Sequence, residues 1–238
     1  MAKKSEFIKY LNNQVELKSI YCWGAQGELL TSISPGWIAR HETSTSNANK
    51  VIKLYEERKG IKGCRAFDCS GLGMYWLHNL KKVFSSDLTA NSLKGKCKKV
   101  AKSSVKAGDF VFKCYPNGKA HHIGYVVDDG YVVEAQGRAY GVVKRKLSAG
   151  GWNWYGRPEI WEEETFHLMR ILKRGMEGGD VKLVQERLNA LGFDCGKADG
   201  ILGPKTEQAI KSFQATKKLT VDGVVGEKTC KALGGEWK

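Results

Sequence analysis

The stretch Asp68-Cys69-Ser70 places a thiol between an acid and a hydroxyl, just before an apolar run that begins at Leu72. If a helix starts here, the free backbone N–H groups of its first turn and the helix dipole favour the thiolate form of Cys69. A thiolate is a strong nucleophile, and the same N–H groups are able to hold an oxyanion. These residue types predict nucleophilic catalysis at Cys69, with a small buried thiol as the alternative.

A nucleophilic thiol needs a base, and the chain offers five histidines. His78 is too far along the same predicted helix to contact Cys69. His121 and His122 open a predicted strand, and only one of them can face inward because strand side chains alternate between faces. His122 is the candidate base.

The turn after this strand decides whether a carboxylate reaches His122. With the three-residue loop 128–130, Val127 lies opposite Tyr131, and Glu134 shares the face of the imidazole. A two-residue loop would instead place His122 and Glu134 on opposite faces. The longer loop predicts that His122 takes the thiol proton and returns it to the leaving amine, while Glu134 orients and charges the imidazole. This arrangement favours a thiolate–imidazolium pair.

The flanking elements indicate an α+β domain. Amphipathic patterns predict helices over residues 1–20 and 46–58, and a third helix from Cys69 through Phe84. A glycine-rich loop is expected at residues 21–27. From residue 108 onward, short runs of Val, Phe and Tyr bounded by Gly and Asp predict strands. Helices first and strands later are typical of an α+β fold, here closing at about residue 164.

The last part of the chain, residues 168–238, has a different pattern. An amphipathic helix is predicted with one apolar face, formed by Val181, Val184, Leu188 and Leu191. Two phrases then repeat, at 199–206 and 222–229: an Asp-Gly turn, two aliphatic residues, a second glycine and a threonine that begins a helix. This pattern predicts a small helical module with internal pseudo-repetition.

Composition sets the class of protein. A chain of 238 residues is long enough for two domains, and it holds no apolar run that would span a membrane. The N-terminus lacks the features of a secretory signal, so synthesis and initial retention in a cytoplasm are expected. Seven cysteines at irregular spacing indicate free thiols. The formal net charge of +14 favours polyanions: nucleic acid, anionic wall polymers or an anionic lipid surface.

Four phrases in residues 17–160 resemble the NlpC/P60 cysteine peptidases. They are Tyr21-x-Trp-Gly, Phe-Asp-Cys69-Ser-Gly-Leu, Gly-Asp-Phe-Val-Phe from residue 108, and His122-Ile-Gly-Tyr-Val. The resemblance implies a permuted papain-like fold and cleavage of peptidoglycan stem peptides between D-γ-glutamate and the diamino acid. It makes Cys69 the nucleophile and His122 the base, and it places the Tyr21 hydroxyl near the thiol.

The same resemblance implies that Asp68 and Ser70 contact substrate. The third catalytic position of the family is usually His, Asn or Gln, and Glu134 occupies it here. Any acceptor can orient the imidazole, so this departure leaves catalysis possible. It also leaves Gln136 as a substitute for Glu134.

Residues 168–238 resemble the peptidoglycan-binding domain appended to wall hydrolases, which implies a three-helix module that anchors to cell-wall glycan or peptide. The whole chain is similar to endolysins of phages or prophages, which wait in the host cytoplasm until they are released. Peptidoglycan is the expected partner, with anionic wall polymers as an additional one. No cofactor is expected, and no metal, because the C-x-x-C and H-x-x-x-H spacings of zinc sites are absent.

Three alternatives stay open at this point. An N-acetylmuramoyl-L-alanine amidase would use the same cysteine on a different bond. A non-catalytic wall-binding protein would carry Cys69 and His122 as vestiges, although an intact Glu134 argues against this. A nucleic-acid binder has only the charge in its favour, because no recognition motif accompanies it.

Overall fold

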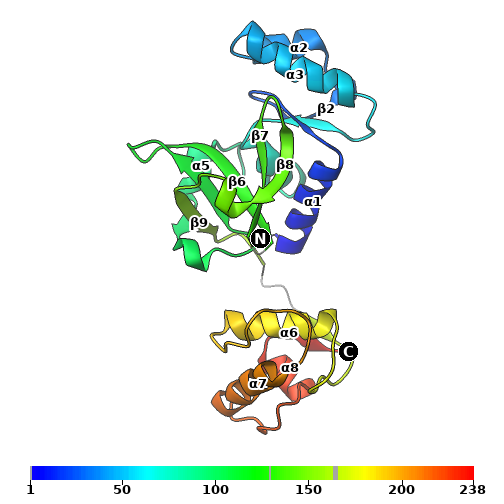
Figure 1. The fold of residues 1–238 in the computed structure, drawn as a ribbon, viewed down its shortest axis with the longest axis vertical. Coiled ribbons are helices and arrows are strands. Elements are labelled where there is room, and N and C mark those ends of the chain that lie inside the picture. Colours follow the sequence, from blue (N-terminus) through cyan, green and yellow to red (C-terminus); the bar gives the residue numbers. More distant parts are fainter. Residues whose placement is uncertain (1, 129, 163–165) are drawn as a thin grey trace. The chain divides into compact units, whose positions relative to one another are not determined.

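The computed structural model describes residues 2–128, 130–162 and 166–238, and the chain divides into two compact units, Met1–Glu162 and Glu163–Lys238 (Figure 1). The predicted domain end at residue 164 and the loop residue Asp129 lie outside the described residues. None of the described helices is long and apolar enough to cross a membrane.

A six-stranded antiparallel sheet organises the first unit. Its spatial order is β4-β9-β5-β6-β7-β8. The strands span Cys97–Lys99 (β4), Phe110–Cys114 (β5), Ala120–Asp128 (β6), Tyr131–Gly137 (β7), Gly141–Lys146 (β8) and Trp154–Pro158 (β9). The strands predicted after residue 108 are therefore confirmed.

The main core lies on one face of this sheet, under helices α1 (Lys4–Glu16) and α4 (Gly71–Met74). Phe7 of α1 and Tyr125 of β6 are both fully buried, and their rings meet edge-on with centroids 5.5 Å apart. The opposite face carries a smaller cluster around Val126 and Trp152. Residues that alternate along β6 thus enter two different environments, as the period of a strand requires.

A second, three-stranded sheet holds the segment before Cys69, in the order β1-β3-β2. Its strands are Ile20–Tyr21 (β1), Gln26–Leu29 (β2) and Arg65–Phe67 (β3). The loop predicted at residues 21–27 is therefore wrong in part, because both of its ends pair with β3. Leaving β3, the chain enters Asp68 and Cys69 directly.

Two helices, α2 (Pro35–His41) and α3 (Thr45–Arg58), lie together beyond β2 in Figure 1. The serines at their starts act as caps: the Ser34 hydroxyl accepts from the Trp37 N–H, and the Ser44 hydroxyl accepts from the Asn47 N–H, each at 3.2 Å. The helix predicted at 46–58 is confirmed as α3, and α2 is an addition to the prediction. Both helices cover a separate apolar cluster.

The helix after Cys69 is shorter than predicted. α4 continues as the π-helical segment η2 (Tyr75–Leu80), and Lys82 then adopts a left-handed backbone with φ 54°. The helix therefore ends at Leu80 and not at Phe84. Further short elements are α5 (Ala90–Gly95) and the 3-10 turns η1 (Leu30–Ser32), η3 (Lys102–Ser104) and η4 (Leu147–Ala149).

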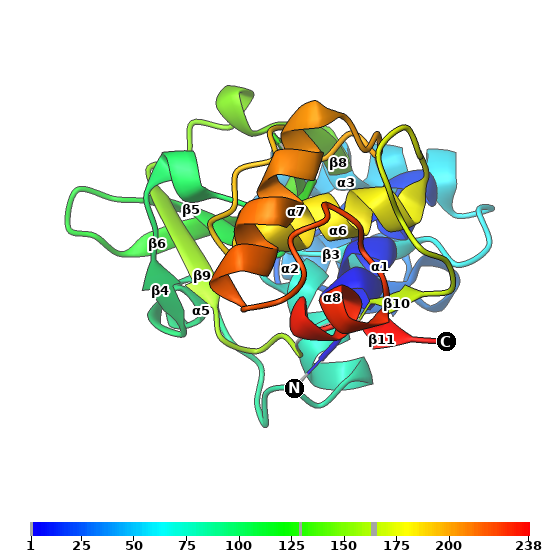
Figure 2. The same cartoon turned by 90° about the horizontal axis from the view of Figure 1, so that it is seen from below.

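The second unit contains the three helices α6 (Gly179–Ala190), α7 (Pro204–Thr216) and α8 (Glu227–Ala232). A short parallel pair, β10 (His167–Leu168) and β11 (Glu236–Trp237), joins its two ends, and β11 lies beside α8 (Figure 2). The predicted apolar face of α6 is confirmed except at Leu191, which follows the helix and is 41% exposed.

The two repeated phrases fold into matching turns. In the first, the Gln185 amide donates to Asp199, to the carbonyl of Ile201 and to Thr206, each at 3.0 Å. In the second, the Gln214 amide makes the same three kinds of bond, to Asp222, Val224 and Thr229, at 2.8–3.2 Å. The prediction that the threonines begin helices is wrong, because α7 starts at Pro204 and α8 at Glu227. Each threonine is buried within the first turn, where it accepts the amide.

Candidate active site

Asp68 shapes the backbone around the thiol. Its carboxylate accepts from the Gly71 N–H at 2.6 Å and from the Ser70 hydroxyl at 3.1 Å. Its own N–H donates to the carbonyl of Ala25 at 2.8 Å. Asp68 therefore caps the start of α4, which holds Cys69 in the turn that leads into the helix. Contact of Asp68 and Ser70 with substrate stays a prediction from the sequence.

Two small contacts fix α4 against β6. The Tyr125 hydroxyl donates to the carbonyl of Ser70 at 3.3 Å. A Cβ atom at Gly73 would lie 2.4 Å from the Tyr125 ring, so only glycine permits this approach. The start of α4 is thus held on the strand that carries His122.

The environment of Cys69 keeps its thiol neutral in the free protein. Burial raises the pKa of Cys69 to about 12, and the neighbouring Asp68 charge acts in the same direction. Hydrogen bonds from the backbone of Ser70, Ile123 and Cys69 itself lower the pKa, but by less. The expected preference for a thiolate is therefore wrong for the free protein, because burial outweighs the helix start. The Ile123 contact places the sulfur beside the residue that follows His122.

The hairpin that carries the base and the carboxylate differs from its prediction. Tyr131 pairs with Asp128 and not with Val127, while Val126 pairs with Val132. Val127 is therefore the extra residue of a β-bulge. The turn is shorter than predicted, but the extra residue of the bulge compensates for this. Beyond the pair Tyr125 and Val133, Gly124 therefore comes opposite Glu134, as the longer loop predicts.

His122 and Glu134 meet as the sequence predicts. Nε2 of His122 lies 2.6 Å from Oε2 of Glu134, whose side chain is fully buried. The second carboxylate oxygen accepts from Nε of Arg145 on β8. Burial raises the pKa of Glu134, but the hydrogen bonds and charges of His122 and Arg145 outweigh it, so the pKa lies below its ordinary value. Glu134 is therefore an anion that holds one imidazole nitrogen and leaves Nδ1 for chemistry.

The indole of Trp152 packs against the imidazole ring of His122. The two rings stack with centroids 5.6 Å apart and 6° between their planes. A Cβ atom at Gly124 would come 2.8 Å from the Trp152 ring, so the glycine makes room for this indole. Stacking and the bond to Glu134 together restrict the orientation of the imidazole.

The other sequence candidates lie apart from this pair. His121 is exposed and stacks on Tyr115, with centroids 4.3 Å apart. His78 contacts the carbonyl of Phe84 through Nδ1, at 2.8 Å. Gln136 is half-buried, and within the described residues it is Glu134 that accepts the hydrogen bond of His122. The structure therefore pairs His122 with Glu134 and leaves Gln136 aside.

Tyr21 lies within electrostatic reach of the thiol, as the resemblance implies. Burial raises the pKa of Tyr21, followed by the Cys69 charge, while Arg138 opposes the shift. The Arg138 guanidinium lies over the Tyr21 ring, 5.4 Å from its centroid. Both the Cys69 thiol and a cation that the sequence analysis missed, Arg138, therefore act on Tyr21.

Arg145, Trp152 and Arg138 were not predicted as site residues. Arg145 carries a weak signal, since strand alternation in Gly141–Lys146 puts it on the same face as Val143, whose register partner on β7 is Glu134. Trp152 and Arg138 lie in segments between strands, where no periodic pattern fixes the direction of a side chain. All seven cysteines are free thiols.

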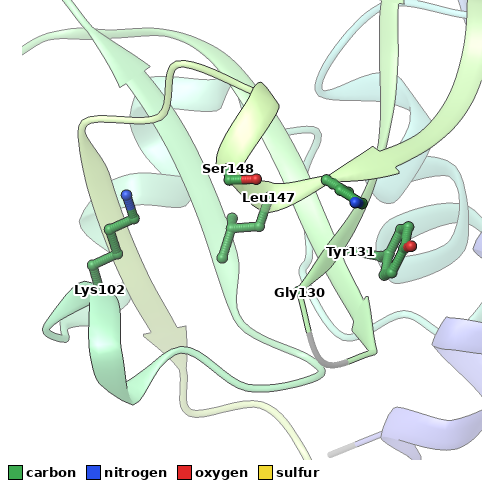
Figure 3. Close-up of a pocket in the computed structure, with 6 residues that line it drawn as sticks. Lys102, Gly130, Tyr131, Leu147 and Ser148 are labelled. Carbon is green, nitrogen blue, oxygen red and sulfur yellow. The ribbon is translucent and has the colours of Figure 1, made fainter.

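Two pockets are lined by residues other than Cys69. One, of about 380 Å³, is at the β6–β7 turn and is lined by two lysines, a tyrosine and a serine among its six residues (Figure 3). The other, of about 370 Å³, lies in the second unit beside the second Asp-Gly turn and includes Ile171 and Thr220. Across residues 2–128, 130–162 and 166–238, no three His, Cys, Asp or Glu side chains form a group that could hold a metal ion.

Residues 56–156 match the NlpC/P60 family, and residues 177–233 match the peptidoglycan binding domain family. A Listeria grayi protein named "Probable endopeptidase p60" is 29% identical over 134 residues, covering 51% of this chain and 25% of that protein. The N-acetylmuramoyl-L-alanine amidase CwlL of Bacillus licheniformis is 46% identical over 65 residues, covering 26% of this chain and 18% of that protein.

Among solved structures, the peptidoglycan hydrolase RipB of Mycobacterium tuberculosis is 20% identical with a TM-score of 0.42, covering 67% of each chain. The SleB N-terminal domain is 40% identical with a TM-score of 0.28, covering 29% of this chain and 93% of that one. This chain spans 18–25% of the length of the curated relatives named above. The two family matches and the α+β and three-helix units agree: the chain consists of an NlpC/P60 domain followed by a peptidoglycan-binding domain.

Proposed function

We propose that this chain is a peptidoglycan hydrolase that cleaves stem peptides with Cys69 as nucleophile, His122 as base and Glu134 as the group that orients the base. The observation that carries the proposal is the 2.6 Å contact between His122 Nε2 and the buried Glu134 carboxylate. It holds an imidazole whose neighbour, Ile123, contacts the Cys69 sulfur through its backbone. A thiol, a base and an orienting anion are the parts that thiol acyl transfer requires.

The mechanism begins with a neutral thiol, because the pKa of Cys69 is about 12. Nδ1 of His122 removes the thiol proton as the sulfur attacks the carbonyl carbon of the scissile amide. Backbone N–H groups of the turn at Cys69 and Ser70, which act on the sulfur, stabilise the oxyanion. The imidazolium, held by Glu134, then donates its proton to the leaving amine, and a thioester to Cys69 remains. Water, activated by the same imidazole, hydrolyses the thioester and restores the thiol.

The bond that we propose lies between D-γ-glutamate and the diamino acid at position three of the stem. Membership of the first unit in the NlpC/P60 family supports this choice. The second unit supports anchoring to the wall, since it matches a peptidoglycan binding family and presents a pocket beside its second repeat. A tethered enzyme works at a high local concentration of substrate.

Mass spectrometry of purified peptidoglycan digested by the wild type and by Cys69→Ala tests this function. We expect stem fragments split after D-glutamate, absent with the variant. Intact stem peptides freed from glycan would identify an N-acetylmuramoyl-L-alanine amidase that uses the same cysteine. Wall binding without products from either protein would identify a non-catalytic wall-binding protein.

Anionic wall polymers are a further proposed ligand. The formal net charge of +14 and the lysine-lined pocket of Figure 3, with Lys102 and Lys146, support an attraction to phosphate-rich polymers. Binding to such walls should weaken as salt rises, because screening shortens the reach of surface charge. The role as an endolysin released from a host cytoplasm stays a prediction from the sequence.

A further inference from the structure

Arg138 is held in a fixed orientation beside the candidate active site. It follows β7 directly, and its Nε donates to Oε2 of Glu42 at 2.5 Å. The Glu42 side chain is fully buried, and its other oxygen accepts from the backbone N–H of Trp23 at 2.9 Å. A carboxylate bound on both oxygens fixes the guanidinium plane, so that little side-chain entropy is left to lose on binding.

The position of Arg138 relates it to the nucleophile. Its guanidinium lies over the ring of Tyr21, and the charges of both Arg138 and Cys69 act on the Tyr21 phenol. The Arg138 side chain is 22% exposed, so a ligand from solvent is able to reach it. A cation is therefore available close to the point where the scissile bond must lie.

Donor counting shows what Arg138 is able to bind. A guanidinium has five N–H donors, and Glu42 uses the one on Nε. Over the described parts of the chain, its two Nη groups make no hydrogen bond to a protein acceptor, and the bond to Glu42 is through Nε. The fork formed by these groups matches the two oxygens of a carboxylate. An arginine needed only to neutralise Glu42 would not require a fork that is left without a protein acceptor and partly exposed beside Tyr21.

We propose that Arg138 binds the free α-carboxylate of the D-glutamyl residue on the acyl side of the scissile bond. In a γ-linked glutamate the α-carboxyl group is outside the peptide chain, a short carbon chain away from the carbonyl that Cys69 attacks. Arg138 thereby selects stem peptides that carry a carboxylate at this position over those that carry a carboxamide. This inference rests on the proposed function and specifies its substrate.

The test compares two synthetic stem peptides, identical except that the D-glutamyl α-group is a carboxylate in one and a carboxamide in the other. The wild type should show a kcat/KM about 10-fold to 100-fold higher for the carboxylate peptide. Arg138→Gln should remove that preference. It should lower kcat/KM for the carboxylate peptide alone, mainly by raising KM. Arg138→Lys, which keeps the charge but not the fork, should be intermediate.

Arg157→Gln is the matched control, because Arg157 also pairs with a buried carboxylate, Asp109, away from Cys69. It should lower thermal stability without changing the preference between the two peptides.

Equal wild-type rates on both peptides would overturn the role of Arg138 while leaving the hydrolase intact, and would do so even if Arg138→Gln failed to fold. Equal losses on both peptides with Arg138→Gln would likewise assign Arg138 a structural role. No cleavage of either peptide by the wild type would contradict the proposed function itself.

Discussion

Glu134 in the first unit and Gln185 and Gln214 in the second are almost completely buried, yet their hydrogen bonds are of different kinds. Each glutamine is neutral and binds the turn next to it: for Gln185, a carboxylate, a carbonyl and a hydroxyl accept from the amide, and the Gly200 N–H donates to it. Glu134 is charged, and it binds two side chains that are themselves cationic or titratable, His122 and Arg145.

This difference distinguishes a structural network from the network to which we assign a function in the proposed mechanism. The glutamine network occurs twice with matching partners, so it is the local solution that one sequence phrase specifies. The Glu134 network brings together three strands, whereas the buried polar side chains among the described residues of the second unit include no carboxylate. Burying a charge costs more free energy than burying an amide, so a charge kept at 0% exposure beside a titratable ring favours a role in chemistry.

Among substitutions within the two networks, the largest expected effect comes from Glu134→Ala. Without an acceptor for Nε2–H, the imidazole loses its orientation, and kcat/KM should fall about 10²-fold to 10⁴-fold. Glu134→Gln keeps an acceptor of the same size and should fall by only about 10-fold. Steady-state hydrolysis of a stem peptide measures both, and equal activity of the alanine variant and the wild type would remove Glu134 from the mechanism.

Gln214→Leu probes the neutral network. Removing the Gln214 amide leaves Asp222 and Thr229 without their hydrogen-bond partner. This should destabilise the second unit by about 2–4 kcal/mol. Gln185→Leu should cost a similar amount, because its partners match. Calorimetry of each variant measures the loss, while hydrolysis of a soluble stem peptide should be unchanged. A large fall in peptide hydrolysis would contradict the separation between the two networks.

The hairpin shows how far sequence reasoning reached into the site. The shared face of His122 and Glu134 was predicted through a turn that the structure does not have. A shorter turn with one bulged residue gives the same strand register as a longer turn without a bulge. A pattern of alternating residues does not distinguish these two cases. The face was therefore predictable, whereas Val127 as the bulged residue was not.

Local signals located Cys69, α3 and the repeated turns, because caps, periodicity and Asp-Gly pairs act over a few residues. Contacts between distant segments left no such signal. Trp152 reaches His122, and Arg138 reaches Glu42, only because the sheets bring these segments together. The thiol pKa was missed for the same reason, since burial is set by packing and not by position at a helix start.

Asp68→Asn sharpens the account of the thiol. Asparagine keeps an oxygen to cap Gly71 but removes the charge that helps to raise the pKa of Cys69. Alkylation of Cys69 by iodoacetamide at pH 8 should therefore be about 3-fold to 10-fold faster. Peptide mapping with Cys69→Ala as the blank assigns the label. An unchanged or slower rate would show that the Asp68 charge does not reach the thiol.

A smaller effect concerns acid stability. The pKa of Glu134 is lowered in the folded protein, so its ionised form contributes stability above the unfolded carboxyl pKa, and this contribution is lost as pH falls through the folded value. The Tm of the wild-type first unit should decline below about pH 4.5, and Glu134→Gln should lack that part of the decline. Thermal scans from pH 7 to pH 3 measure the difference, and parallel Tm profiles would contradict it.

The most direct test of the central claim is the rate of stem-peptide hydrolysis by Cys69→Ala beside Cys114→Ala. Cys114 is a half-buried thiol of the same unit, on β5, and serves as the matched control. We expect Cys69→Ala to lose at least about 10³-fold in kcat and Cys114→Ala to stay close to the wild type. Retention of activity by Cys69→Ala would show that the thiol between Asp68 and Ser70 is not the nucleophile.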